Sequence, residues 1–184
     1  MGLAIAEELA GRGAEVVLVC GPVNLKTHHP AIRRVDVESA AQMYEVTSRE
    51  FANSDVAVLS AAVADFTPKE KADHKIKRGK DDLVLELLPT KDIAAELGKM
   101  KNASQLLVGF ALETNDEEVN ALSKMQRKNL DMIVLNSLND KGAGFGVDTN
   151  KVTIMDKAGN RTVYELKTKL EVAKDIVDQI ASRL

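Results

Sequence analysis

The chain has 184 residues, 45% of them hydrophobic, which is enough for one substantial core, so we expect a single compact unit. Its 25 basic and 28 acidic residues give a net charge of -3 at pH 7, and this balance argues against a general affinity for nucleic acid or for a membrane surface. Because no apolar run approaches the ~20 residues that cross a bilayer and Cys20 is the only cysteine, we expect a cytoplasmic protein without a disulfide framework.

The first part of the chain alternates between the period of helices and that of buried strands. Leu3, Ile5 and Leu9 recur at helical spacing, and this predicted helix ends at a glycine before a continuous apolar strand. Ser39 has the side chain of an N-cap for the next helix. In chain order we predict a helix, two strands, a helix and a strand, over residues 3–11, 16–20, 31–37, 40–52 and 56–64.

The second part begins with a charged stretch, 66–82, that has the composition of a loop. After it we predict a strand, a helix, a strand, a helix, a strand, a hairpin and an amphipathic helix, over residues 83–89, 90–100, 105–113, 115–125, 130–137, 151–166 and 169–184. Thr90 is the expected cap of the first of these helices, and Thr114 or Asn115 that of the second. The apolar face of the second carries Val119, Leu122 and Met125. This order predicts an α/β fold with a Rossmann-like open, mostly parallel sheet, helices on both faces and a small β-hairpin extension.

In open α/β sheets, ligands bind where the carboxyl ends of parallel strands meet. Asp65 follows the strand 56–64, residues 110–114 follow the buried strand stretch 106–109, and Asn136 follows the buried strand stretch 132–135. The pattern predicts one site that is lined from several strand ends. Ser60 and Ala61 are small enough for a flat ligand to approach the backbone, and Asp65 can accept hydrogen bonds from a base or ribose. The same residues also fit close helix packing and a turn cap, and the pattern does not decide between the two.

The loop after Asp65 is rich in cations, which suit a triphosphate because a lysine ammonium is a mobile point charge. These cations are Lys69, Lys71, Lys75, Lys77, Arg78 and Lys80. A solvated flexible loop is the competing interpretation of such a charge run. Lys124 and Lys128, four residues apart on one predicted helix face, could reach one anion or pair with Asp131 and other surface acids.

Other polar and glycine-rich features favour no site. Cys20 ends an apolar run and fits a small core residue better than a nucleophile. His28 and His29 have no partner at metal-ligand spacing. The glycines of "GAGFGVD" open no helix, so the dinucleotide-binding fingerprint does not apply.

Six phrases in fixed order carry a resemblance to a known family: "AAVADF", "KIKR", "PTKDI", "VGFALET", "KMQRKNLDMIVLN" and "GFGVDTN". Together they resemble phosphopantothenate–cysteine ligase, also called phosphopantothenoylcysteine synthetase, and the resemblance covers nearly the whole chain. It implies a Rossmann-like fold with a dimerisation part, and therefore a homodimer. It also implies a carboxylate substrate, 4'-phosphopantothenate, that is activated by CTP with Mg2+ to an acyl cytidylate, from which cysteine displaces CMP. A flavin decarboxylase, fused or separately encoded, is the implied partner.

The resemblance also implies roles for individual residues. The implied catalytic residues are Ala61, Lys75, Lys77 and Arg78: Lys75 matches a loop lysine needed for activation, and Lys77 and Arg78 match a lid over the intermediate. The implied nucleotide contacts are Leu59, Ser60, Ala61, Asp65, Lys75, Lys91, Asp92, Ile93, Ala94, Phe110, Lys124 and Lys128. Metal ligands are not implied. Phe66 stands where the family usually has tyrosine or tryptophan, and Lys91 where it usually has proline.

The front of the chain departs from the family pattern. The family begins with a strand, a glycine-rich turn and an "SSGKMG" phosphate loop, whereas this sequence starts at the final "MG". We therefore expect one ligase domain over 1–184 that is truncated at its N-terminus, has an open slot in its sheet, and is a poor catalyst or inactive. The alternatives are a non-catalytic nucleotide-binding module and a nicotinamide-dependent oxidoreductase of the same fold.

Overall fold

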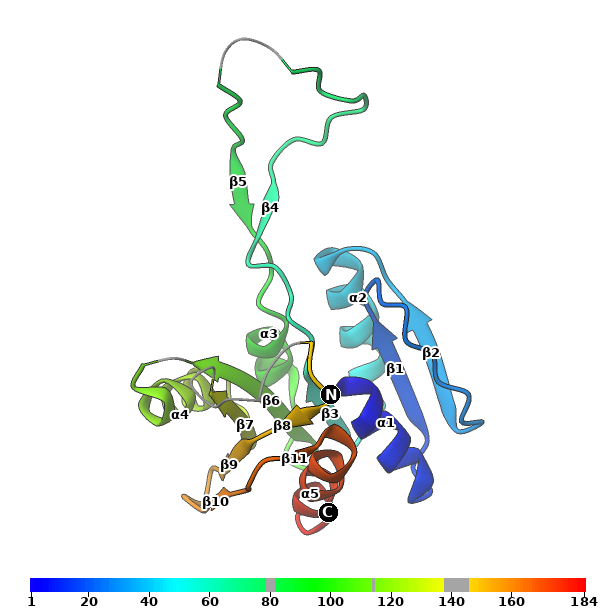
Figure 1. Ribbon diagram of the computed structural model, residues 1–184, viewed down its shortest axis with the longest axis vertical. Helices are drawn as coiled ribbons and strands as arrows, with labels where there is room; N and C mark the ends of the chain where they lie inside the picture. Colours follow the sequence, from blue (N-terminus) through cyan, green and yellow to red (C-terminus); the bar gives the residue numbers. More distant parts are fainter. Residues whose placement is uncertain (79–81, 114, 138–145) are drawn as a thin grey trace.

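The structure is a computed structural model that describes residues 1–78, 82–113, 115–137 and 146–184. Its centre is a five-stranded sheet in the order β10-β9-β7-β6-β3 (Figure 1). Three strands are parallel: β3 (Val56–Leu59), β6 (Leu106–Glu113) and β7 (Met132–Ser137). The last two, β9 (Val152–Asp156) and β10 (Arg161–Val163), run antiparallel and form the predicted hairpin. The expected mostly parallel α/β sheet is therefore confirmed.

A second, two-stranded sheet lies beside the first (Figure 1). It pairs β1 (Val16–Cys20) with β2 (Ile32–Asp36) in parallel, with Val16 opposite Ile32. Neither strand pairs with any strand of the central sheet within the described residues. The slot expected from the sequence is therefore present between β1 and β3.

Helices cover both faces, as the alternation of the sequence predicts. On one face, α1 (Gly2–Gly11) and α5 (Lys169–Ala181) lie side by side, and Ile5 and Ile176 share an apolar cluster with Val108 of β6. On the other face lie α2 (Ala40–Phe51), α3 (Ile93–Met100) and α4 (Glu117–Arg127), where Leu97 packs with Leu107 of the same strand. Successive strand residues enter opposite clusters because strand side chains alternate between the two faces.

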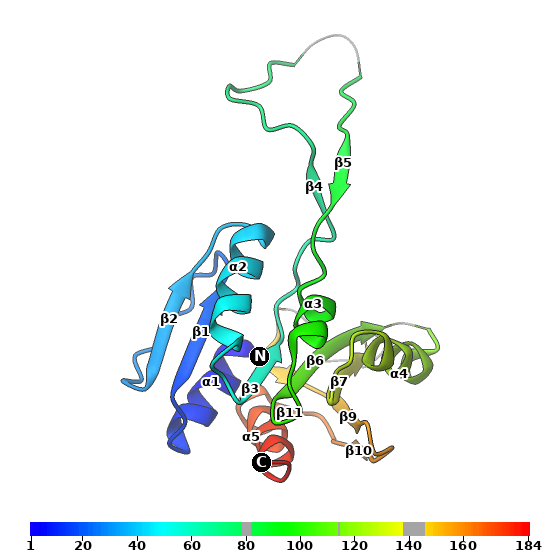
Figure 2. The same cartoon turned by 180° about the vertical axis from the view of Figure 1, so that it is seen from behind.

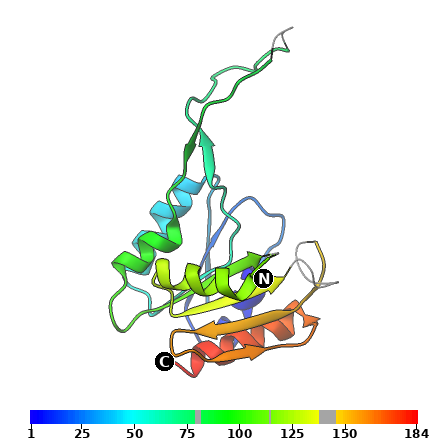
Figure 3. The same cartoon turned by 90° about the vertical axis from the view of Figure 1, so that its left-hand side faces the viewer.

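A long arm leaves the body between β3 and α3. Its base is a short antiparallel pair, β4 (Phe66–Pro68) and β5 (Leu87–Pro89), and the segment between them extends far beyond the helices and sheets (Figures 2 and 3). Apolar arm residues are exposed: Phe66, Ile76, Leu83, Val84, Leu85, Leu87 and Leu88. A smaller antiparallel pair, β8 (Thr149–Asn150) with β11 (Lys167–Thr168), precedes α5 and was not predicted.

Several boundaries differ from the expected ones. The strand predicted over 56–64 ends at Leu59, and of the strand predicted over 83–89 only Leu87–Pro89 pairs. Asp92, and not Thr90, caps α3 by accepting a hydrogen bond from the Ala95 amide, because Thr90 donates its hydroxyl to the Ala64 carbonyl instead.

The second of the late helices also differs from its prediction. Its N-cap is Asp116, not Asn115, and Thr114 lies outside the described residues. Val119 and Leu122 are exposed, whereas Met125 and Ala121 face the core. Among the described residues, no helix is long and apolar enough to cross a membrane.

Candidate functional site

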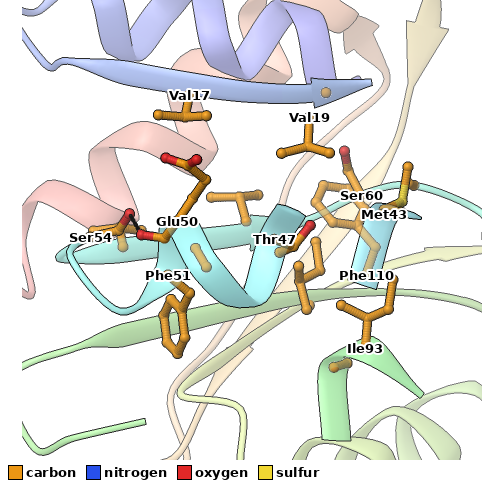
Figure 4. Close-up of a pocket in the computed structure, with 18 of the residues that line it drawn as sticks. Val17, Val19, Met43, Thr47, Glu50, Phe51, Ser54, Ser60, Ile93 and Phe110 are labelled. Atoms are coloured by element: carbon orange, nitrogen blue, oxygen red, sulfur yellow. Dashed lines mark hydrogen bonds between the residues drawn. The ribbon is translucent and has the colours of Figure 1, made fainter. Parts of the chain in front are cut away.

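One cavity of about 910 Å3 runs along the slot between β1 and β3 and continues past the carboxyl ends of the strands. Figure 4 shows Val17 and Val19 on the β1 side, facing Glu50 and Thr47 of α2. At the other end, Ser60 and Phe110 lie where β3 and β6 approach their carboxyl ends. The cavity therefore joins an apolar slot to a polar cleft at the strand ends.

The polar cleft is bounded by the first turns of two helices. Gly2 of α1 packs so closely on Ser60 that a methyl group at position 2 would lie 2.7 Å from the serine Oγ. Ile93 and Ala94, at the start of α3, also line the cavity. The first amides of a helix have no partner within the helix and carry partial positive charge, so this end of the cavity suits an anion.

Lys128 is held at this cleft by an aspartate. Its Nζ lies 3.0 Å from Asp92 Oδ1, which also accepts the Ala95 amide at 3.1 Å. Burial alone would raise the pKa of the Asp92 carboxyl, but the hydrogen bonds from Lys128 and from the Ala95 amide outweigh it and hold the pKa below its usual value. The carboxylate thus fixes a cation and caps a helix at once.

Two further cations are placed around the same cleft. Lys124 Nζ lies 3.1 Å from Glu113 Oε1, at the end of β6. The Nζ of Lys91 lies 4.2 Å from the centre of the Tyr44 ring, within the range of a cation–π contact. Both lysines line the cavity, and both can exchange these contacts for a bound anion.

The structure brings most of the sequence-predicted site residues to this one cavity. They are Leu59, Ser60, Ala61, Asp65, Lys91, Asp92, Ile93, Ala94, Phe110, Lys124 and Lys128. Lys124 and Lys128 do not pair with Asp131, whose carboxylate is held by Lys101 and Lys157. The competing interpretation of this lysine pair was therefore wrong for Asp131 but confirmed for other nearby acids, because Lys124 pairs with Glu113 and Lys128 with Asp92.

The three arm cations are not brought to the cavity. Lys75, Lys77 and Arg78 are exposed and belong to the segment between β4 and β5 that extends away from the body (Figure 1). Lys80 lies outside the described residues. The arm leaves the body as a paired two-stranded stem, so these cations reach a cavity only by bending of the arm or by meeting another molecule.

Sequence reasoning missed the slot side of the cavity. Met43, Thr47 and Glu50 of α2 line it, and Arg33 of β2 donates a hydrogen bond to Glu50 that lowers the pKa of this carboxyl. The sequence of α2 gave no indication that these residues line a cavity, because the cavity exists only where β1 and β3 lie apart in the fold.

Asn136 has a different environment from the predicted one. It lies near the end of β7 and is not among the residues that line the cavity. Its buried Oδ1 has no hydrogen-bond partner among the described residues. The glycine-rich stretch before β8 lies outside the described residues up to Phe145.

The described residues contain no group of three or more His, Cys, Asp or Glu side chains that could hold a metal ion. The carboxylates at the strand ends of the cavity are Asp65 and Asp92. Mg2+ in proteins is commonly bound by one or two carboxylates together with substrate phosphates, so this set fits a Mg2+ ion that arrives with a triphosphate.

Comparison with known proteins identifies the family. A model described as the C-terminal domain of DNA/pantothenate metabolism flavoproteins (DFP) matches residues 1–184. The chain belongs to the DFP family. A solved C-terminal domain of the coenzyme A biosynthesis bifunctional protein CoaBC superimposes with a TM-score of 0.81 at 40% identity, over 97% of this chain and 79% of that one.

Two curated relatives show how this DFP domain relates to longer proteins. A CoaBC of Bacillus subtilis (strain 168) is 45% identical over 182 residues, 99% of this chain and 45% of the relative. A protein of an unknown prokaryotic organism, named cysteine/cysteine sulfinic acid decarboxylase, is 59% identical over 180 residues, 98% of this chain and 50% of the relative. The chain thus spans about half the length of these curated relatives.

Proposed function

We propose that this DFP domain binds CTP at the strand-end cleft and, within a complete protein, ligates 4'-phosphopantothenate with cysteine in coenzyme A biosynthesis. The observation that carries the proposal is the cavity itself. It gathers the small residues after β3, the first turn of α3, Lys91 before α3, and Lys124 and Lys128 of α4 at one carboxyl edge of a parallel sheet. This is the place where α/β sheets bind nucleotides.

Each group has a role that follows from its chemistry. Ser60 and Ala61 let the nucleoside approach the backbone, and Asp65 accepts hydrogen bonds from it. The substrate carboxylate attacks the α-phosphate of CTP, pyrophosphate leaves, and the resulting acyl cytidylate has CMP as a good leaving group. The cysteine amine then attacks the acyl carbon and CMP departs with its bonding electron pair, while the amine gives up a proton.

Cations accelerate the first step because negative charge grows on the phosphate oxygens as the new bond forms. Lys124 and Lys128 can turn from Glu113 and Asp92 toward those oxygens. A Mg2+ ion bound with the triphosphate would supply further charge neutralisation, and Asp65 and Asp92, which line this end of the cavity, are the carboxylates that would hold it. The first amides of α3 point their partial charge at the same region.

The arm gives this proposal a role for Lys75, Lys77 and Arg78. These cations extend away from the cavity of their own body, and apolar residues near them, such as Val84, are 86% exposed. In a homodimer the apolar arm residues would be covered by the second copy, and the arm cations could close on a site shared between copies. The partner flavin decarboxylase belongs to the same proposal, since the CoaBC relative is bifunctional by name.

A second candidate function follows from the name of one relative. Cysteine/cysteine sulfinic acid decarboxylase describes a protein twice as long as this chain, and the name does not say which half decarboxylates. Decarboxylation releases CO2 from the substrate and consumes no nucleoside triphosphate. Consumption of CTP therefore separates the two candidates.

The test measures release of pyrophosphate from CTP by a protein that contains this domain together with the rest of a CoaBC-like chain. We expect release that requires 4'-phosphopantothenate and Mg2+, and an amide product when cysteine is added. Lys75→Gln should abolish release, whereas Lys71→Gln, on the same arm, should leave release unchanged. Release of CO2 from cysteine or cysteine sulfinate without CTP consumption would favour the decarboxylase.

A further inference from the structure

Three lysines of the described residues line the cavity at the strand ends, and they are held in two different ways. Lys124 and Lys128 are each paired with a carboxylate oxygen, at 3.1 and 2.9 Å. Lys91 forms no salt bridge within the described ranges, and its Nζ lies 4.2 Å from the centre of the Tyr44 ring. Two of these cations are therefore held by negative charges and the third by a neutral ring.

The kind of partner decides which cation an entering anion recruits first. When Lys128 turns from Asp92 to a phosphate, it leaves a carboxylate unpaired close to the new negative charge, and the two repel each other. When Lys91 turns from Tyr44, it leaves an uncharged ring. A cation–π contact at an exposed site is also weak, equivalent to a factor of about two to five in an equilibrium constant. Lys91 is exposed, so it is the cation that moves at the lowest cost.

Tyr44 is placed to hold this lysine without belonging to the cavity. It lies on α2, and its half-buried side chain packs against the apolar cluster that contains Ile93, the first residue of α3. Met43 and Thr47 of the same helix line the cavity, whereas Tyr44 does not. A ligand in the cavity can therefore reach Lys91 without touching the ring.

The position of Lys91 in the chain brings it to the first turn of α3. It precedes the N-cap Asp92 by one residue and lines the cavity together with Ile93 and Ala94. The amides of this turn attract an anion, but the Asp92 carboxylate at the same turn repels it. An additional cation is needed there, and Lys91 supplies it without removing the partner of any carboxylate.

We infer that Tyr44 is a positioning residue of this cleft: without an anion its ring holds the Lys91 ammonium beside the cavity, and an entering polyphosphate takes the lysine from the ring. Because the ring competes with the anion, it lowers the affinity of the cleft. Lys91 is the first of the three lysines to move. This inference rests on the proposed assignment of the cleft to phosphate groups, but not on CTP or on ligation, since any polyphosphate would have the same effect.

A double-mutant cycle tests the pair by calorimetric titration of the 184-residue chain with pyrophosphate in the absence of Mg2+. Lys91→Gln should weaken binding about five- to tenfold, because the cleft loses a cation. Tyr44→Leu should tighten binding about two- to fivefold, because the competing contact is lost. When Lys91→Gln is already present, Tyr44→Leu should have no effect on affinity. Tyr44→Phe keeps the face of the ring and should bind as the parent chain does.

The chain offers a matched control for this cycle. The Nζ of Lys167 lies 5.2 Å from the centre of the Tyr164 ring, and neither residue lines the cavity. Lys167→Gln removes a cation of the same kind from a ring outside the cleft. It should leave pyrophosphate binding unchanged.

Tyrosine spectroscopy follows the movement directly. The sequence has no tryptophan and two tyrosines, so Tyr164→Phe leaves Tyr44 as the single tyrosine. In this background, pyrophosphate should change the near-ultraviolet absorption and the fluorescence of Tyr44, because a positive charge leaves the face of its ring. With Lys91→Gln added, the change should disappear. This measurement needs no substitution at Tyr44, so it remains decisive if Tyr44→Leu does not fold.

Coupling between the two positions, together with a tyrosine signal that depends on Lys91, supports the inference. It is overturned if Tyr44→Leu in the folded chain fails to tighten binding, if its effect persists in Lys91→Gln, or if the tyrosine signal persists without the lysine. Such a result, with Lys128→Gln still weakening pyrophosphate binding, would leave the proposed nucleotide site standing. No saturable pyrophosphate binding would overturn the inference and count against a phosphate site, whereas failure of CTP-dependent ligation alone would leave the inference intact.

Discussion

The ammonium of Lys128 lies 2.9 Å from Oδ2 of Asp92, the residue whose other carboxylate oxygen caps α3. The lysine is the C-cap of α4 and the aspartate the N-cap of α3, so the contact joins two elements through residues 36 positions apart in sequence. A phosphate that binds Lys128 must compete with this carboxylate. The pair therefore sets how strongly the cleft attracts an anion.

Replacing Asp92 by asparagine separates its two roles. Asparagine keeps the N-cap, so the free energy of unfolding should fall by less than about 1 kcal/mol, whereas Asp92→Ala should cost about 1 kcal/mol for the cap in addition to the lost pair. Without the competing charge, pyrophosphate in the absence of Mg2+ should bind Asp92→Asn several-fold more tightly. Calorimetric titration measures this affinity, and weaker binding to Asp92→Asn would contradict the assigned competition.

Lys124 and Lys128 should both contribute to nucleotide binding. Neutralising either one as Lys124→Gln or Lys128→Gln should weaken CTP binding about tenfold, because each removes a cation from a partly enclosed cleft. The matched control is Lys99→Gln, an exposed lysine that pairs with Glu96 three residues earlier on α3. Equal effects of all three substitutions would indicate a general charge effect instead of a cleft contact.

Gly98 is required where α3 meets the end of α4. A methyl group at position 98 would lie 2.0 Å from the Lys128 carbonyl oxygen, and the Gly98 carbonyl accepts the Asn129 side-chain amide at 2.7 Å. Gly98→Ala should therefore lower the free energy of unfolding by about 1–3 kcal/mol despite the better helix propensity of alanine. Urea denaturation measures the change.

The control for this substitution is Gly11→Ala at the end of α1, where nothing lies within 4 Å of the added methyl. It should be neutral or stabilising by up to about 1 kcal/mol. A Gly98→Ala protein as stable as Gly11→Ala would show that α3 and α4 can separate without loss. If Gly98→Ala binds CTP more weakly under conditions in which it is fully folded, the added methyl group has displaced Lys128.

Asp131 should make stability depend on pH in the acid range. Its carboxylate accepts hydrogen bonds from Lys101, whose side chain is 8% exposed, and from the Leu107 amide. Burial alone would raise its pKa, but the hydrogen bonds outweigh this and hold the pKa below its usual value. A carboxyl whose pKa is lowered by folding stabilises the folded protein. This contribution is fully present at pH values above the pKa of the group in the unfolded chain, and it is lost as pH falls through the pKa of the group in the folded protein.

The substitution Asp131→Asn leaves the Lys101 ammonium without its charge partner and should cost about 2–3 kcal/mol at pH 7. The difference from the parent chain should shrink only at pH values below the usual aspartate pKa, as pH falls through the lowered pKa of the folded Asp131 carboxyl. Urea denaturation at a series of pH values measures it, with exposed Asp55→Asn as the control expected to change little. A difference that stays constant down to acid pH would contradict the role of the carboxylate charge.

Elements with strong local signals were predicted well. Ser39 was expected to cap α2, and its hydroxyl accepts the Gln42 amide in a complete capping box. The hairpin of β9 and β10 followed from two alternating strands about a short polar turn. In contrast, Thr90 lost the cap of α3 because Ala64, 26 residues earlier, offers its hydroxyl a better partner. A local pattern cannot report such a competitor.

The apolar face of α4 shows the same limit. Val119 and Leu122 have helical spacing with Met125, but the helix turns Ala121 and Met125 to the core. The sequence of α4 offers two apolar faces, and packing against β7 determines which of them is buried.

The sequence also did not predict the position of the arm. Its composition indicated a loop, but not a loop that carries Lys75 away from the cavity.

By itself the sequence determined the alternation of helices and strands, the parallel sheet and the residue types at the strand ends, because propensity, capping and hydrophobic period act between near neighbours. The tertiary structure alone decided which side chains share a cavity, which cations are held by carboxylates, and where the sheet is open. These depend on distances between elements far apart in the chain. The slot between β1 and β3 illustrates this, because both strands have ordinary strand sequences and only the distance between them in the fold opens the cavity.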